Sequence, residues 1–319
     1  FSRTRAGTYG EGSDPSNPNY GAALPAPLDT PFEFKFELEE NNAYLFDHFD
    51  MGDRWHAMAG VTYVQLKGHN DLSGTREKTL DNDDVVYALG LVRDISDQTS
   101  VFASWSQSYE GNGGRDANGN FFEPSEGEQF ELGVKGDALE ERLFYTLSLF
   151  DLTQSNITTT DPANPMFSAP LGEVNIRGAE LDLSATLTER LDGIMALTYH
   201  DSEITENNDG REGNELANTP NFSGTWRLSY AASNDLRLGG SLIYVGEREG
   251  ADFGPTFEVD DYTRVDLDME WRAPQVRGLT ISAQVENLFG EDYVAGSSSA
   301  NRIQLGRPQT FWLSTKYDF

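Results

Sequence analysis

The sequence predicts an all-β chain that forms a portion of an antiparallel transmembrane β-barrel. The first observation behind this prediction is alternation of apolar and polar residues, which is clearest at the end of the chain. There Phe311, Leu313 and Tyr317 fall on one face of a strand and Ser314 and Lys316 fall on the other. The second observation is that short turns alternate with long polar loops. An outer-membrane barrel needs both features, because lipid offers its backbone no water to bond and its long loops face outward.

Alternation bounded by turn residues gives about thirteen strands along the chain. In order, they are expected near 43–51, 54–67, 85–94, 99–109, 128–136, 142–156, 174–187, 191–203, 221–232, 236–248, 261–272, 279–289 and 308–319. Many have about the 9–11 residues that cross a bilayer at a tilt.

The connections between these strands alternate in length. Short links are expected at 52–53, 95–98, 137–141, 188–190, 233–235 and 273–278. Long polar links are expected at 68–84, 110–127, 157–173, 204–220, 249–260 and 290–307. A β-sandwich also alternates apolar and polar residues, but this asymmetry of the loops favours the barrel.

Composition is compatible with a membrane barrel, although the 319 residues are only 37% hydrophobic and the mean hydropathy is −0.54. Barrel strands are apolar at every second residue, so low hydropathy is expected of them. The formal net charge of −30 argues against nucleic acid or anionic head groups as principal partners. The absence of cysteine excludes disulfides, thiol catalysis and cysteine-ligated metal.

The N-terminal part differs from the rest of the chain in composition. Residues 1–42 are acidic and rich in proline and glycine, and are interpreted as the remnant of an extracellular loop, followed by barrel at 43–319. An odd number of strands leaves the first without a partner, since bacterial single-chain barrels have an even number. The chain is therefore expected to be the C-terminal portion of a larger barrel.

Several ordered segments resemble one family. They are GEQFELGVKG at 127–136, LFDLTQSNITTTDPANP at 149–165, GEVNIRGAELDLSATL at 172–187, YVGERE at 244–249, VENLFGEDYVA at 285–295 and NRIQLGRPQTFWLSTKYDF at 301–319. In these segments the chain resembles the C-terminal barrel part of TonB-dependent outer-membrane receptors for ferric siderophores, most of all the ferric-hydroxamate, or ferrichrome-type, group.

The resemblance implies a 22-stranded barrel in the outer membrane of a Gram-negative bacterium, with a plug domain and a TonB box that this chain lacks. It implies TonB-dependent uptake of a ferric siderophore, with the TonB–ExbB–ExbD complex, outer-membrane lipid and the barrel-assembly machinery as partners. Other cargo, such as a cobalamin or a glycan, and a passive porin are the alternatives. An outer-membrane hydrolase is a further alternative, but the sequence contains no recognisable nucleophile elbow or paired histidine, so no enzyme is expected.

Aromatic residues in or beside the long loops are the candidates for cargo contact, because a wrapped iron complex needs aromatic walls and a few donors. The candidate ligand-binding residues are Tyr109, Phe121, Phe122, Phe167, Tyr244, Phe253, Tyr293 and Arg302. No catalytic residue, cofactor or resident metal site is expected. Iron enters only as part of the cargo.

Two further expectations concern charge. Carboxylates on the polar face are expected to pair with Arg177, Arg227 or Arg264 across strands, as a hydrated interior requires. The acidic loops are expected to favour a neutral or cationic ferric hydroxamate over a strongly anionic ferric catecholate. His200 is expected on the polar face near the end of its strand.

Overall fold

The computed structural model describes residues 4–6, 32–72, 75–112, 116, 122–161, 163–164, 167–207, 210–251 and 256–319. The chain divides into two units, one of residues 1–43 and 62–85 and the other of residues 44–61 and 86–319. Strands β2, β3 and β4 pass through both units. No helix in the described part is long and apolar enough to cross a membrane.

All regular structure in the described residues is β-strand. Ten strands lie within residues 1–231: β1 (Thr4–Ala6), β2 (Phe32–Asp50), β3 (Trp55–Leu72), β4 (Thr75–Asp94), β5 (Thr99–Glu110), β6 (Ser125–Ala138), β7 (Leu143–Thr160), β8 (Ser168–Thr188), β9 (Leu191–Glu206) and β10 (Phe222–Ala231). Eight follow: β11 (Leu236–Val245), β12 (Arg248–Glu249), β13 (Glu258–Val259), β14 (Tyr262–Arg272), β15 (Leu279–Glu286), β16 (Val294–Ser299), β17 (Arg302–Leu305) and β18 (Thr310–Tyr317).

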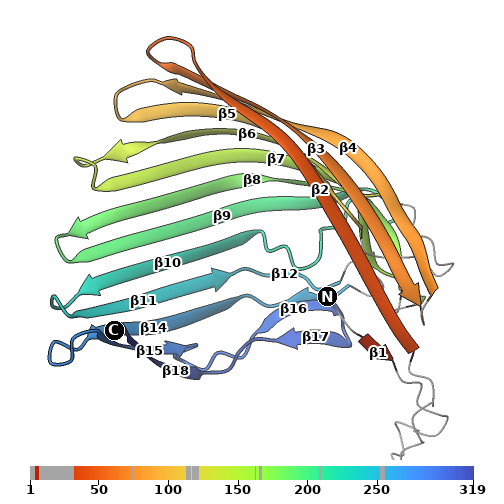
Figure 1. The fold of residues 1–319 in the computed structure, drawn as a ribbon. Coiled ribbons are helices and arrows are strands. Elements are labelled where there is room, and N and C mark those ends of the chain that lie inside the picture. Colours follow the sequence, from red (N-terminus) through yellow and green to blue (C-terminus); the bar gives the residue numbers. More distant parts are fainter. Residues whose placement is uncertain are drawn as a thin grey trace, which may run out of the picture. The chain divides into compact units, whose positions relative to one another are not determined.

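The strands of the main sheet pair in the order in which they occur along the chain (Figure 1). The order of the 14-stranded sheet is β1 to β11, then β14, β15 and β18, and the remaining strands form two separate hairpins, β12–β13 and β16–β17. The thirteen predicted strands correspond to thirteen of these fourteen, and β1 is the addition. The prediction of an antiparallel all-β sheet is confirmed.

Several expected boundaries were wrong. Strand β2 begins at Phe32 rather than near 43, because residues 32–40 alternate as FEFKFELEE and so form strand rather than loop. The expected loop at 68–84 is mostly strand, since β3 ends at Leu72 and β4 begins at Thr75. Strand β18 ends at Tyr317, so Phe319 lies beyond it, with its ring edge-on to Tyr317 at 5.0 Å.

One face of the larger unit is apolar, as the register of its strands demonstrates. Residues that pair across antiparallel strands share a face. One such row runs through Leu91, Ala103, Leu132, Leu149, Ala179, Tyr199 and Phe222. Another runs through Leu228, Gly240, Leu267, Val285 and Phe311.

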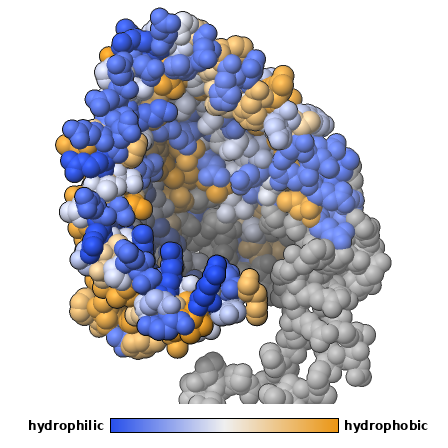
Figure 2. Space-filling view, turned by 60° about the vertical axis from the view of Figure 1, so that its left-hand side comes forward, coloured by the Kyte–Doolittle hydropathy of each residue, from blue (hydrophilic) through white to orange (hydrophobic). Residues whose placement is uncertain are grey.

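These apolar side chains are exposed rather than buried, with Leu132 at 59% and Leu149 at 58% of their full exposure. Large exposed apolar surface is rare on soluble monomers and is what a lipid-facing sheet requires. Figure 2 shows hydrophilic residues along the rim that carries the short turns, with hydrophobic residues on the sheet behind it.

Among the described residues of this unit, a small fully buried apolar cluster lies at the loop ends of β7, β8 and β9. Val174 and Ile204 have no exposed surface, and Ile157 and Leu216 pack against them. The pairing of β7 with β8 shifts register between Gln154 and Thr158, next to Asn156, whose φ is 56°. Burial at this cluster anchors the loop that follows β9.

Candidate functional site

The candidate site lies at the ends of β9, β11, β14 and β15 that are opposite the short turns. Three connections meet there, and their described residues are 207 and 210–221, 246–251 and 256–261, and 287–309. They are called here the loop cluster. Described residues of these connections join one another and the strand ends through an extensive set of polar contacts.

Asn287 is the most completely bonded residue of the site. Its side-chain Nδ2 donates to the carbonyl oxygens of Glu291 at 2.8 Å and Arg307 at 3.0 Å, and its Oδ1 accepts from the Glu291 amide at 2.8 Å. Its own amide donates to Asp266 Oδ1 at 2.8 Å. Only 1% of the residue is exposed, and its φ of 53° is in the left-handed region that asparagine tolerates. Asn287 therefore fixes the start of the connection 287–309.

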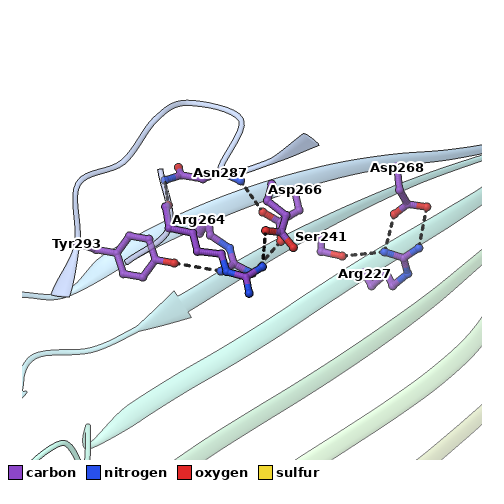
Figure 3. A network of polar contacts seen from close by, with 9 residues as sticks. Arg227, Ser241, Arg264, Asp266, Asp268, Asn287 and Tyr293 are labelled. Atoms are coloured by element: carbon purple, nitrogen blue, oxygen red, sulfur yellow. Dashed lines mark hydrogen bonds and ion pairs between the residues drawn. The ribbon is translucent and has the colours of Figure 1, made fainter. Parts of the chain in front are cut away.

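Arg264 extends this network along β14, as Figure 3 shows. Its Nη2 lies 2.9 Å from Asp266 Oδ2, and its Nη1 donates to the Tyr293 hydroxyl at 3.1 Å. The Tyr293 ring stacks on Tyr262, with centroids 4.2 Å apart and planes 25° apart. Asp266 thus accepts hydrogen bonds from the Arg264 guanidinium and from the Asn287 amide. Tyr293 is held by the hydrogen bond from Arg264 and by stacking on Tyr262.

Arg248 adds a second arginine to the site, beside Tyr262. Its Nη2 donates to the Val294 carbonyl oxygen at 2.5 Å, and its guanidinium carbon lies 5.9 Å from the centre of the Tyr262 ring. Only 4% of Arg248 is exposed. The bond from Nη2 joins β12 to the start of β16, whereas Nη1 is buried and has no hydrogen-bond partner among the described residues.

Asn218 joins all three connections of the loop cluster. Its amide donates to the Glu249 carbonyl oxygen at 2.8 Å. Its side chain bonds both backbone groups of Ser297, with Nδ2 to the carbonyl oxygen at 2.7 Å and Oδ1 from the amide at 2.8 Å. The Ser297 hydroxyl donates to the Gly250 carbonyl oxygen at 2.7 Å.

A bidentate ion pair lies on the polar face, farther from the loop cluster than Arg264. Arg227 Nη1 is 2.8 Å from Asp268 Oδ1 and Nη2 is 3.0 Å from Oδ2, while Nη1 also donates to the Ser241 hydroxyl at 3.0 Å (Figure 3). Gly239 makes room for the pair, because a Cβ there would lie 2.5 Å from the carboxylate oxygens. The expected pairing of an arginine with a polar-face carboxylate across strands is confirmed for Arg227, and Arg177 lies 4.0 Å from Glu203 on the neighbouring strand. Arg264 instead pairs with Asp266 on its own strand.

The fold brings two of the quoted sequence segments together. Arg248 belongs to YVGERE, and Asn287 and Tyr293 belong to VENLFGEDYVA. Their contacts to Val294, Asp266 and Arg264 explain why these segments carry arginine, asparagine and tyrosine. The sequence identified the segments but gave no signal that they touch, and it did not identify Asn218 at all.

The predicted ligand-binding residues are dispersed. Tyr293 lies in the network, where it is half-buried. Phe122 and Phe167 are half-buried in the connections after β5 and β7, and Arg302 is exposed at the start of β17. Phe121 and Phe253 lie outside the described residues.

The other two predicted residues are on the apolar face. Tyr244 pairs with Thr263 and Gly224 in the same face as Leu242, and its ring lies 5.9 Å from that of Phe222. Tyr109 is on the same face of β5 as Trp105. Aromatic side chains at this level of the apolar face are typical of the girdle at a membrane interface, so the structure does not bring Tyr109 and Tyr244 to the loop cluster.

His200 lies on the polar face, as expected, where it pairs across the sheet with Gly178. Its Nε2 is buried and has no hydrogen-bond partner in the structure. Among the described residues no three histidine or carboxylate side chains are arranged to hold a metal ion.

A sheet with one exposed apolar face, short turns at one end and bonded loops at the other defines an outer-membrane β-barrel protein. The family model for the TonB dependent receptor-like β-barrel matches residues 1–288, and the chain belongs to this family. Its place is therefore the outer membrane of a Gram-negative bacterium, in a family of receptors rather than enzymes.

Individual relatives agree with this assignment. The metal-pseudopaline receptor CntO of Pseudomonas aeruginosa is 30% identical over 96% of this chain and 44% of the relative. The ferrioxamine receptor of Yersinia enterocolitica is 27% identical over 88% of this chain and 40% of the relative. The crystal structure of the siderophore receptor PiuA from Acinetobacter baumannii has a TM-score of 0.75 at 22% identity, and the match covers 90% of this chain and 44% of that one. The chain thus spans less than half the length of the relatives it matches.

Proposed function

We propose that the protein binds a metal-loaded siderophore at the loop cluster and, with TonB, takes it up across the outer membrane. Family membership supports the class of receptor. Relatives named for ferrioxamine, ferrichrome and metal-pseudopaline support a metal complex as cargo over a cobalamin or a glycan. Iron or another metal then arrives already wrapped by the cargo, which needs no metal ligands from the protein.

The observation that carries the choice of cargo is the charge of the loops. Glu110, Glu123, Glu126, Glu206, Glu212, Glu215, Glu258 and Asp260 are exposed in or beside the connections on this side of the sheet. Such a field repels a polyanion, attracts a cationic complex and leaves a neutral one without electrostatic penalty. We infer a ferric hydroxamate as cargo, rather than a strongly anionic ferric catecholate.

A second candidate cargo is a metal–pseudopaline complex. It is favoured by the relative at 30% identity, which is named for that cargo and matches 96% of this chain. The TonB–ExbB–ExbD complex would supply the energy for either cargo, and the barrel-assembly machinery would insert the protein, as in the family that the sequence resembles.

Equilibrium binding tests the proposal directly. Labelled ferrichrome, ferric enterobactin and metal-loaded pseudopaline are titrated onto the purified protein at physiological ionic strength and at 1 M salt. The Debye length falls from about 8 Å to about 3 Å between these conditions, so the penalty on the polyanionic catecholate is expected to shrink at high salt. Tighter binding of the catecholate than of ferrichrome at low salt would contradict the inference from charge.

A loop variant separates the effect of loop charge on cargo binding from the effect of loop shape. Glu212→Gln with Glu215→Gln removes two exposed charges from one connection, and is expected to improve catecholate binding at low salt without altering it at 1 M. The matched control is Glu140→Gln with Glu141→Gln in the short turn between β6 and β7. An equal change in the control would show that the effect is not local to the loops.

A further inference from the structure

Asn218 makes an unusual contact for a loop residue. Its carboxamide bonds the amide and the carbonyl oxygen of Ser297 at 2.8 and 2.7 Å, so one side chain makes the pair of hydrogen bonds that a neighbouring strand would make to this residue. Its backbone φ is 60°, and its amide donates to Glu249. Position 218 therefore requires a residue that tolerates the left-handed region and whose side chain carries both a hydrogen-bond donor and an acceptor. Asparagine meets both requirements.

The loop that carries Asn218 is itself anchored. Leu216 packs on the buried pair Val174 and Ile204, and its amide donates to the Ser202 hydroxyl at 3.1 Å. The Ile204 amide in turn donates to the Asn214 carbonyl oxygen at 2.9 Å. Asn218 is thus fixed to the main sheet two residues after a buried contact.

The hairpin on the other side of the contact is not fixed by strand pairing. Strands β16 and β17 pair only with each other in the described part of the chain, and their register shifts on both sides of Ser297. An isolated two-stranded hairpin is marginally stable in water. Its position therefore depends on contacts to neighbours, among them Arg248 at Val294, and Asn218 and Gly250 at Ser297.

We propose that Asn218 is a positioning residue for cargo binding, which holds the β16–β17 hairpin in the arrangement that receives cargo. The proposal rests on the proposed function, since it assigns a role within that same loop cluster. A hairpin that is ordered before cargo arrives keeps the binding-competent fraction of the protein high. When this fraction falls, the apparent affinity falls with it.

The test uses Asn218→Gly, which removes the carboxamide and keeps the left-handed backbone free of strain. The protein is purified from outer membranes, and heat-modifiable migration on gels confirms that it is folded. Hydrogen exchange at residues 294–305 is expected to be roughly tenfold faster, because the two hydrogen bonds to the Ser297 backbone and the weaker one from its hydroxyl are lost. This readout needs no cargo.

Cargo kinetics give the second readout. With whichever of ferrichrome, ferrioxamine B or metal-loaded pseudopaline binds the unaltered protein, the association rate is expected to fall about three- to tenfold with the dissociation rate unchanged. Loss of a direct cargo contact would instead raise the dissociation rate. Faster exchange with unchanged association would overturn the positioning role, and unchanged exchange would overturn the contact itself.

Two variants complete the design. Asn234→Gly, in the exposed short turn between β10 and β11 at the opposite end of the strands, is the matched control and is expected to leave the association rate unaltered. Ser297→Ala keeps the two bonds between the Asn218 side chain and the Ser297 backbone, and removes the hydroxyl bonds to the Gly250 carbonyl oxygen at 2.7 Å and to Asn218 Oδ1 at 3.3 Å. Because the shorter of the two lost bonds joins Gly250, this variant should loosen residues 248–251 and 256–259 more than 294–305. If none of the three cargoes binds the unaltered protein, the proposed function and the positioning role both fail, whereas the exchange result still decides whether Asn218 holds the hairpin.

Discussion

Replacement of Asn287 tests whether the polar network orders the loop cluster. Asn287→Ala leaves three backbone groups without partners, namely the amide and carbonyl oxygen of Glu291 and the carbonyl oxygen of Arg307. Glu291 and Arg307 are exposed residues, so each loss should be near the lower end of the range, about 1 kcal/mol. Alanine at a φ of 53° adds roughly 1–2 kcal/mol. The free energy of unfolding is therefore expected to fall by about 4–5 kcal/mol.

Asn287→Gly divides this loss into its two parts. Glycine adopts the left-handed conformation without strain, so only the lost hydrogen bonds remain and the expected loss is about 3 kcal/mol. The measurement is urea unfolding in lipid vesicles, followed by tryptophan fluorescence, with exposed Asn301→Ala as the control. A loss below about 1 kcal/mol for Asn287→Ala would refute the reasoning, and equal losses for alanine and glycine would refute the backbone part.

Three further predictions concern the membrane. Cysteine at Leu181 or Leu267 should react with lipid-soluble probes and cysteine at Asp182 with water-soluble ones, and the reverse pattern would refute the register. Leu267→Arg near the bilayer midplane should lower the free energy of unfolding by about 2–4 kcal/mol, with Asp182→Arg far milder. Deletion of Phe319, which lies beyond β18 and packs edge-on against Tyr317, should reduce the amount of folded, heat-modifiable protein in the membrane, whereas an unchanged yield would show that this aromatic end is not used in assembly.

The sequence predicted the strands well because the period-2 signal is local. Each apolar row could be read from one strand at a time, as with Leu181 and Leu183 or Leu267 and Met269. Strand ends on the loop side were harder to predict, because a strand that continues beyond the membrane is polar on both faces. The start of β2 is an instructive exception, since FEFKFELEE alternates clearly but follows a segment rich in proline and glycine.

The site was only partly predictable, because its contacts join distant parts of the chain. Asn218 and Ser297 are 79 residues apart, and Arg248 and Val294 are 46 apart. Neither pair has a local signal in the sequence. The aromatic candidates for ligand binding were chosen because they lie in or beside long loops in the sequence. For Tyr109 and Tyr244, this criterion could not distinguish a residue of the membrane-interface girdle from a residue at the loop cluster.

The place of the register shifts has a consequence for how this kind of protein diverges. An inserted residue within a strand would turn every following side chain to the opposite face. In β7 and β8 the shifts near Asn156 and between Glu173 and Val174 instead lie on the loop side of the apolar rows. A bulge there absorbs the added residue before the lipid-facing part begins. Changes of length in the outer loops can thus accumulate over generations, while the membrane-facing surface keeps its pattern.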